Sequence, residues 1–181
     1  MLASTLAPLP GADEATWQAL LHASIVAERE GRVEDAEGLL IDARREAERP
    51  GTAPMLLALS TESLADFYHR SGRLAEAEPL LVRSIQMWDE ILGPDQPRVG
   101  IPVHNLAVLY LTGCRVDEAL PLIHRVAALW GSTLGAQHAD RVSAMRTEAT
   151  LLRKCGRADE ASKLESEGAT PSPAGADRPG S

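Results

Sequence analysis

The sequence predicts an all-α protein built from about four stacked helix-turn-helix units, with eight helices in all. The first observation is a ten-residue motif that recurs at residues 31–40, 72–81, 114–123 and 156–165. Successive copies begin 41, 42 and 42 residues apart, and a fixed period of this length is typical of repeated supersecondary units. The second is composition, because aromatic residues make up only 3% of the chain while Ala and Leu abound. Such a composition favours helices that pack through small side chains.

The first helix of each unit is expected to end at a glycine. The segment "LADFYHRSG" (64–72) reaches Gly72, and glycine accepts the left-handed conformation that closes a helix. In the third unit Cys114 breaks this column, and Gly113, one residue earlier, is a second candidate for closing the helix. The predicted first helices span residues 13–30, 53–71, 96–113 and 138–155.

The second helix of each unit carries a column of small residues, which lets paired helices approach closely: Ala36, Ala77, Ala119 and Ala161. Leu40, Leu81 and Ile123 follow four residues later on the same face, where the fourth unit has Glu165. Pro79 and Pro121 share a column, which predicts a gentle bend near the start of these helices unless the helices begin at the proline. The predicted second helices span residues 33–48, 74–92, 116–134 and 158–167.

These helices define a repeat domain over residues 13–168. Its four repeats are expected at about residues 13–50, 51–92, 93–134 and 135–168. Residues 1–12 are expected to be a flexible arm. Residues 169–181 are rich in Pro, Gly, Ser and Ala, with little to bury, and predict a disordered tail.

The pattern resembles the tetratricopeptide repeat, in the 42-residue form seen in kinesin light chains. The resemblance rests on "NLAVLYLTGCRVDEALPLI" (105–123), "LGPDQPRVG" (92–100) and "SLADFYHRSGRLAEAEPLL" (63–81). It implies a right-handed α-solenoid whose first helices line a concave groove for a peptide or a partner helix. The terminal units depart from the pattern, most clearly at Glu148, which stands in a usually apolar place.

Charge and composition exclude several classes of partner. The net charge is −8 and the pI is near 5.1, so we expect no nucleic acid and no anionic membrane as a ligand. The first residues carry no basic segment and no long apolar run, so we expect no secretory signal and a cytoplasmic location. Cys114 and Cys155 occupy adjacent columns and could lie within reach of each other, but we expect two reduced thiols.

Motifs for catalysis are missing from the sequence. There is no nucleotide-binding glycine loop, no H-E-x-x-H and no C-x-x-C, and the five histidines stand singly. The recurring carboxylate pairs, such as Asp117 with Glu118, open the second helices, where negative charge suits the helix N-terminus. The sequence therefore predicts no catalytic residue, no cofactor and no metal site, and a protein that is not an enzyme.

Matching columns to the resembled family yields candidate groove residues on the first helices. In that family an Asn in the column of Asn105 commonly holds the ligand backbone, and only the third repeat has one here. In the first repeat the same columns hold Gln18, Leu21, Ile25, Glu28 and Arg29. The candidate partner-binding residues of the other repeats are Glu62, Asp66, His69, Arg70, His104, Asn105, Val108, Leu111, Arg146, Thr150, Arg153 and Lys154.

The charge is uneven along the chain, with net −5 over residues 12–50, net −3 over 51–92 and zero over 93–134 and 135–168. A partner with a basic portion facing repeats 1 and 2 and an acidic portion facing repeat 4 fits this distribution, and ordinary solvated faces are the alternative. The expected function is a scaffold or adaptor that binds a protein or peptide. A dedicated chaperone or regulator of one client, and a sensor of a small molecule or peptide, remain open, as does self-association through the ends of the array.

Overall fold

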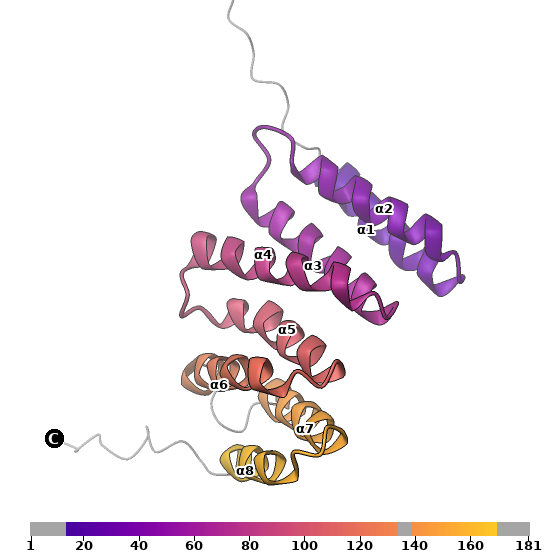
Figure 1. The fold of residues 1–181 in the computed structure, drawn as a ribbon. Helices are drawn as coiled ribbons and strands as arrows, with labels where there is room; N and C mark the ends of the chain where they lie inside the picture. Colours follow the sequence, from indigo (N-terminus) through magenta and orange to yellow (C-terminus); the bar gives the residue numbers. More distant parts are fainter. Residues whose placement is uncertain (1–13, 134–138, 170–181) are drawn as a thin grey trace, which may run out of the picture. The chain divides into compact units, whose positions relative to one another are not determined.

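The computed structural model describes residues 14–133 and 139–169, and within these ranges it contains eight α-helices, one short 3-10 helix and no strand (Figure 1). The predicted all-α fold class is confirmed. The predicted arm at residues 1–12 and the predicted tail beyond Ala169 lie outside the described residues. The elements are α1 Glu14–Arg29, α2 Val33–Ala47, α3 Pro54–Arg70, α4 Leu74–Leu92, η1 Pro97–Val99, α5 Gly100–Thr112, α6 Val116–Thr133, α7 Ala139–Lys154 and α8 Ala158–Ala169.

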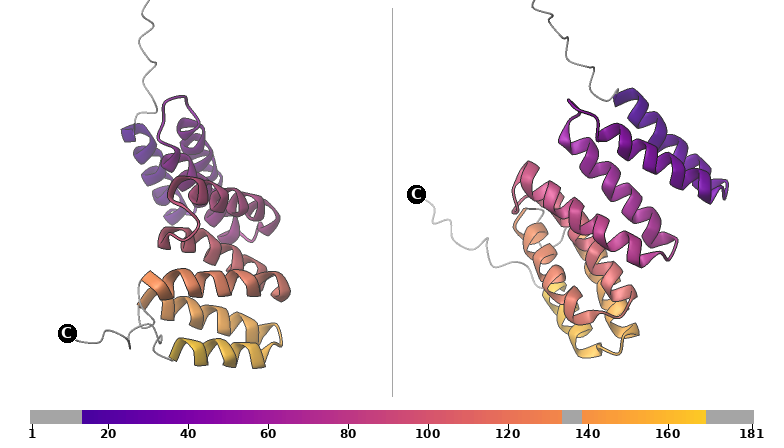
Figure 2. Two further views of the ribbon diagram at one scale, coloured as in Figure 1. Left: turned by 90° about the vertical axis from the view of Figure 1, so that its left-hand side faces the viewer. Right: turned by 45° about the horizontal axis from the view of Figure 1, so that its top comes forward.

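The helices divide between two compact units, Met1–Ile91 and Leu92–Ser181. In the first unit α2 packs against both α1 and α3, so that one helix pair stacks on the next. In the second unit α5 packs against α6 and α7, and α7 packs against α8 (Figure 2). Each unit therefore repeats the same arrangement, in which paired helices bury their small-residue faces against each other.

The alanine column is the point of closest packing, as the sequence predicts. Ala36, Ala77, Ala119 and Ala161 are all 0% exposed. In the second unit Ala119 and Ala161 join a core that includes Leu111, Ile123 and Leu152. In the first unit Ala36 packs with Ala27, Leu40, Leu64 and Phe67. Pro79 and Pro121 lie inside α4 and α6, so the alternative that these helices begin at the proline is wrong.

The turn between the paired helices needs one residue in the left-handed conformation. Gly31, Gly72 and Gly156 take it with φ of +73°, +74° and +79°. In the third helix-turn-helix repeat Cys114 takes this conformation, with φ of +54°, while Gly113 has φ of −85°. Gly113 is the C-cap residue of α5, but the left-handed conformation falls to Cys114 and not to Gly113. The reason is that the turn is closed by a backbone hydrogen bond that spans the same number of residues in each repeat. Arg115 N donates to Tyr110 O at 2.8 Å, as Arg73 N does to Tyr68 O, and this places the left-handed residue in column with Gly72.

The two cysteines are joined in the structure. Cys114 and Cys155 form a disulfide whose Cα atoms lie 5.5 Å apart, although 41 residues separate them in sequence. The expectation of two reduced thiols is wrong for this structure. The physical reason is the stacking of α5 on α7, which brings the turn after α5 beside the turn after α7.

Buried tryptophans fix the ends of several helices. Trp17 Nε1 donates to Ser60 Oγ at 2.6 Å, and Trp88 Nε1 donates to a Glu62 oxygen at 3.2 Å. Trp130 Nε1 donates to the Pro97 carbonyl at 3.0 Å, and its ring covers Gly100. Each ring thus buries its apolar surface while its single donor is satisfied.

An arginine directly precedes the second helix of each pair and bonds to a carboxylate three residues further along the chain. The pairs are Arg32–Asp35, Arg73–Glu76, Arg115–Glu118 and Arg157–Glu160. The sequence predicts the carboxylates at this place from the helix dipole, and the structure adds their arginine partners.

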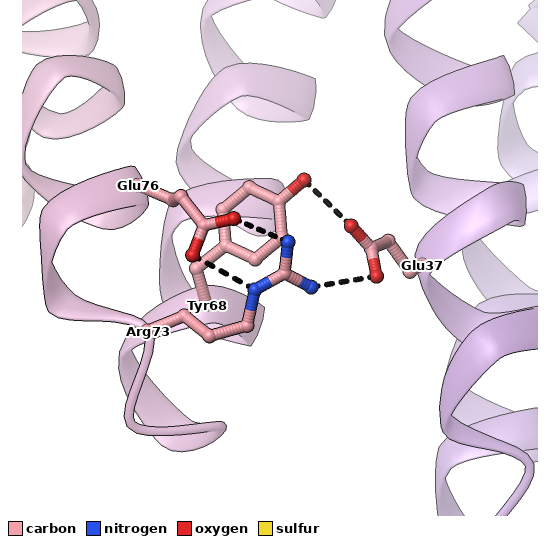
Figure 3. Close-up of polar contacts among 4 residues, drawn as sticks. All are labelled: Glu37, Tyr68, Arg73 and Glu76. Carbon is pink, nitrogen blue, oxygen red and sulfur yellow. Dashed lines mark hydrogen bonds and ion pairs between the residues drawn. The ribbon is translucent and has the colours of Figure 1, made fainter.

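Arg73 also links two successive repeats of the first unit (Figure 3). Its Nη1 donates to Glu37 at 2.7 Å, the Tyr68 hydroxyl donates to the same carboxylate at 2.9 Å, and the guanidinium lies 4.3 Å from the Tyr68 ring centre. The hydrogen bond from Arg73, helped by the one from Tyr68, holds the pKa of Glu37 below its ordinary value. Arg157 plays the same part in the second unit, where it reaches Asp117 at 3.1 Å.

Candidate functional site

The first unit has a hollow on its first helices, with a volume of about 590 Å³. Leu21, Ile25 and Leu40 give it an aliphatic lining, and Ile25 is 48% exposed, so part of this lining is open to a ligand. The remaining lining residues are Ser24, Glu28, Arg29, Ser63, Asp66 and Arg70. The hollow can therefore accept an apolar side chain within a ring of polar and charged groups.

The acids of this hollow are already bonded within the chain. Arg70 forms an ion pair with Asp66, Nε to Oδ2 at 3.0 Å, and a second ion pair with Glu28. The single charge of Arg70 balances one of the two carboxylates, so these three side chains together keep a net charge of −1. Arg29 is the contrast, because it is exposed and forms no ion pair within the described parts of the chain.

Two predicted residues of the first unit do not line the hollow. Glu62 accepts the Trp88 hydrogen bond and so holds a buried tryptophan in place. His69 is half-buried, and its pKa is lowered because burial disfavours the charged imidazolium. Of the four predicted residues here, the structure brings only Asp66 and Arg70 into the hollow.

In the second unit His104 bonds to a buried acid. His104 Nδ1 lies 3.0 Å from an oxygen of Glu148, whose side chain is 1% exposed. The Trp130 ring centre lies 5.8 Å from that of His104. This pair explains the departure of Glu148 from the apolar pattern, because a buried carboxyl group needs a hydrogen-bonding partner. His104 is consequently directed into the protein, with only a fifth of its side chain exposed.

Two further predictions of the second unit need correction. Leu111 is 1% exposed and belongs to the core, so its side chain does not face a partner. Arg153 bonds to both oxygens of Glu165 on α8, at 2.7 and 2.6 Å, so its charge is compensated within the chain. This bidentate pair lowers the pKa of Glu165. Column matching places both residues on the correct helix, but it does not reveal which neighbour each one meets.

The remaining predicted residues of the second unit stay accessible. Asn105 and Val108 are half-buried, while Arg146, Thr150 and Lys154 are exposed. Thr150 Oγ1 donates to the Arg146 carbonyl at 2.8 Å and is satisfied within its own helix. Within residues 14–133 and 139–169, Arg146 and Lys154 form no ion pair, and the Asn105 amide makes no hydrogen bond.

The second helices carry hollows of their own. One of about 540 Å³ lies in the first unit and includes Ile41, Tyr68, Pro79 and Leu80. A smaller one of about 230 Å³ lies between α6 and α8 in the second unit. Among the described residues, no group of three or more His, Cys, Asp or Glu side chains is placed to hold a metal ion. In the same residues no helix is both long enough and apolar enough to cross a bilayer.

Comparison with known proteins finds a local match to a repeat family and a shared fold. A family model described as a tetratricopeptide repeat matches residues 55–115. The structure of BtubC (BKLC) from P. vanneervenii aligns with a TM-score of 0.72 and 21% identity, over 83% of this chain and 60% of that one. A putative kinesin light chain of Podosopora anserina with nearly identical TPR-like repeats aligns with a TM-score of 0.72 and 23% identity, over 83% of this chain and 72% of that one. No curated protein matches.

The two structural likenesses concern the fold and not the partners. At 21% and 23% identity, the two structures show that the fold is shared. The chain spans 60% of the length of BtubC, so the activity and partners of that whole protein are not transferred to it.

Proposed function

We propose, from the premise that the chain is a tetratricopeptide repeat protein with the fold of kinesin-light-chain-like repeats, that it is a non-catalytic scaffold or adaptor that binds a protein or peptide. The resemblance predicted from the sequence is confirmed, and repeats of this family generally mediate protein–protein interaction. The binding residues, the partner and its chemistry are our proposal. It places the ligand on the first helices, which supply most of the lining of the first unit's hollow and carry Asn105, Arg146 and Lys154 in the second unit.

The observation that supports the proposal is which charged side chains of the first helices form ion pairs within the chain. The acids Glu28 and Asp66 are both bonded to Arg70, whereas the cations Arg29, Arg146 and Lys154 have no ion pair in the described residues. Arg83 and Lys163 on the second helices also form no ion pair in the described residues, so the first-helix cations are distinguished by their place: Arg29 at the apolar hollow, and Arg146 with Lys154 on α7. Uncompensated cations at these places suit a ligand with carboxylates. This modifies the expectation that repeats 1 and 2 face a basic portion of the partner.

In the first unit the ligand would combine an apolar side chain with an acidic neighbour. The hollow offers Leu21, Ile25 and Leu40 to the apolar side chain. Arg29, at the same hollow, offers a guanidinium to a carboxylate. Apolar burial would supply affinity, and the charge would select the acidic sequence.

In the second unit the ligand would be held through its backbone. The Asn105 side chain can both donate to and accept from a peptide group. Arg146 and Lys154 on α7 would meet carboxylates, from acidic side chains or a free C-terminus. Arg153 is left out of this proposal because Glu165 already holds it.

The test begins with affinity capture of partners by the full chain, followed by titration calorimetry with the captured protein. Arg146→Glu and Lys154→Glu are expected to slow association and to flatten its dependence on salt. The matched control is Arg83→Glu, an equal charge reversal at an exposed position of a second helix, α4. If the control weakens binding as much as the other two, net charge rather than the first-helix face governs the interaction, and our assignment is wrong.

The same capture separates the alternative functions. Several clients favour a general adaptor, and one abundant client favours a dedicated chaperone or regulator. A retained small molecule favours a sensor. A cytoplasmic location and self-association through the ends of the array remain proposals, which fractionation and light scattering would test.

A further inference from the structure

The turn after α5 differs chemically from the other turns of the same kind. Three of them place glycine at the left-handed position, while here Cys114 takes it with φ of +54°. A residue with a Cβ is disfavoured in this region because Cβ crowds the following carbonyl. The thiol therefore stands at this turn against a local backbone preference.

The second thiol stands at the neighbouring turn. Cys155 directly precedes Gly156, in the column next to that of Cys114. The two Cα atoms lie 5.5 Å apart, within the range that a disulfide requires. Cys114 is exposed and Cys155 is half-buried, so small thiols and disulfides in solution can reach the pair.

We propose that Cys114 and Cys155 form a reversible redox lock that ties the last helix pair, α7 and α8, to α5 and α6. Within the described residues the α7–α8 pair packs against α5 and α6 and against no further helix pair, and a pair supported on one side opens locally more readily than one held on both. Within the described residues α8 contributes just Ala161 and Leu164 to the buried core of the second unit. A covalent link that closes a 41-residue loop restrains this end in a way that its small buried surface does not.

The chemistry is thiol–disulfide exchange with a small-molecule disulfide such as oxidised glutathione. The Cys114 thiolate, the more exposed of the two, attacks one sulfur of the oxidant, whose S–S bond breaks and releases one thiolate. The Cys155 thiolate then attacks the Cys114 sulfur of the mixed disulfide and expels the second small thiol. The two protein thiols lose two protons and two electrons, and the oxidant is reduced to two thiols. Excess reduced glutathione reverses both steps.

The pair can therefore be reduced in a reducing compartment and close on oxidation. Disulfides of cytosolic proteins are usually transient and redox-sensing, which agrees with the proposed cytoplasmic location. The lock itself depends only on the geometry of the second unit, and it stands or falls independently of the proposed binding function.

The test uses the full chain equilibrated in glutathione buffers of increasing oxidised fraction. Thiols are trapped by alkylation and counted by intact mass. We expect an intramolecular disulfide in the wild type, and a single glutathione adduct, with no internal bond, in Cys155→Ser. Two free thiols, or two separate glutathione adducts, in the fully oxidised buffer would overturn the proposal.

Hydrogen exchange then tests the locking itself. Reduction is expected to raise amide exchange in α7 and α8 by about tenfold or more, while α1 and α2, which lack cysteine, exchange unchanged. Cys114→Gly is the matched variant, because glycine accepts the left-handed turn without a side chain. It should exchange like the reduced wild type, or more slowly, in both buffers. If the disulfide forms without slowing exchange in α7 and α8, the pair is bonded but locks nothing, and the proposal fails.

Discussion

The substitution Gly100→Ala tests the packing of the second unit most directly. Gly100 is the first residue of α5 and is buried beneath Trp130. A Cβ added there would lie 2.2 Å from Trp130 Nε1 and 2.7 Å from its Cε2. Non-bonded heavy atoms normally approach to about 3.5–4 Å, so the indole ring must move or α5 must shift.

The magnitude follows from what the movement disturbs. Trp130 is 7% exposed, and its Nε1 donates to Pro97 at 3.0 Å. Overpacking of a dense core costs about 1–3 kcal/mol, and the strained hydrogen bond adds up to about 1 kcal/mol. The preference of helices for Ala over Gly offsets roughly 0.5–1 kcal/mol of this. We therefore expect the free energy of unfolding to fall by about 1–3 kcal/mol.

The assay is thermal and urea unfolding followed by circular dichroism, with Gly38→Ala as the matched control. Gly38 lies inside α2, and an added Cβ there meets no atom within 4 Å. This control should gain up to about 1 kcal/mol, because alanine favours the helix and restricts the unfolded chain. If Gly100→Ala also gains stability, Trp130 does not cover Gly100 as described and the reasoning is refuted.

Four further outcomes are expected. Ala119→Leu should lower the free energy of unfolding by about 1–3 kcal/mol in urea titrations, since it forces apart two closely packed helices. The pKa of Glu37 is lower in the folded state than in the unfolded state, so ionised Glu37 stabilises the fold above its unfolded pKa. This stability is lost as the pH falls through the folded-state pKa. Glu37→Gln should therefore weaken the acid dependence of the melting temperature. His104→Ala should cost about 1–3 kcal/mol in melting experiments by removing the partner of buried Glu148. Asn105→Ala should weaken partner binding in calorimetry by about 1–3 kcal/mol without changing the melting temperature.

Helix bounds were accessible from the sequence because their determinants are local. The alanine column and the left-handed turn recur at a fixed period, and most predicted ends lie within two residues of the observed ones. The start of α5 is the exception, since a 3-10 turn over Pro97–Val99 precedes it. Gly113, the second candidate for the turn after α5, does not take the left-handed conformation, because position outweighs residue type here. The turn geometry fixes which residue is left-handed, and Cys114 occupies that position.

The candidate site was less accessible because column matching locates a side chain on a helix without identifying its neighbours. Arg153 and Lys154 are adjacent cations in the sequence, yet one is bonded to Glu165 and the other forms no ion pair in the described residues. Column matching assigns both Leu111 and Val108 to the groove, but Leu111 lies in the core. The acids Glu28 and Asp66 read as an acidic face until Arg70 is placed between them.

The sequence by itself determined the helical repeat, its period and the small-residue packing, because each repeat writes these into its own residues at fixed spacing. Only the tertiary structure decided which charges remain for a partner, that His104 satisfies Glu148, and that Cys114 meets Cys155. The physical reason is distance along the chain. Glu148 lies 44 residues from His104, and Cys155 lies 41 residues from Cys114, so these pairs exist only once one helix pair has stacked on the next.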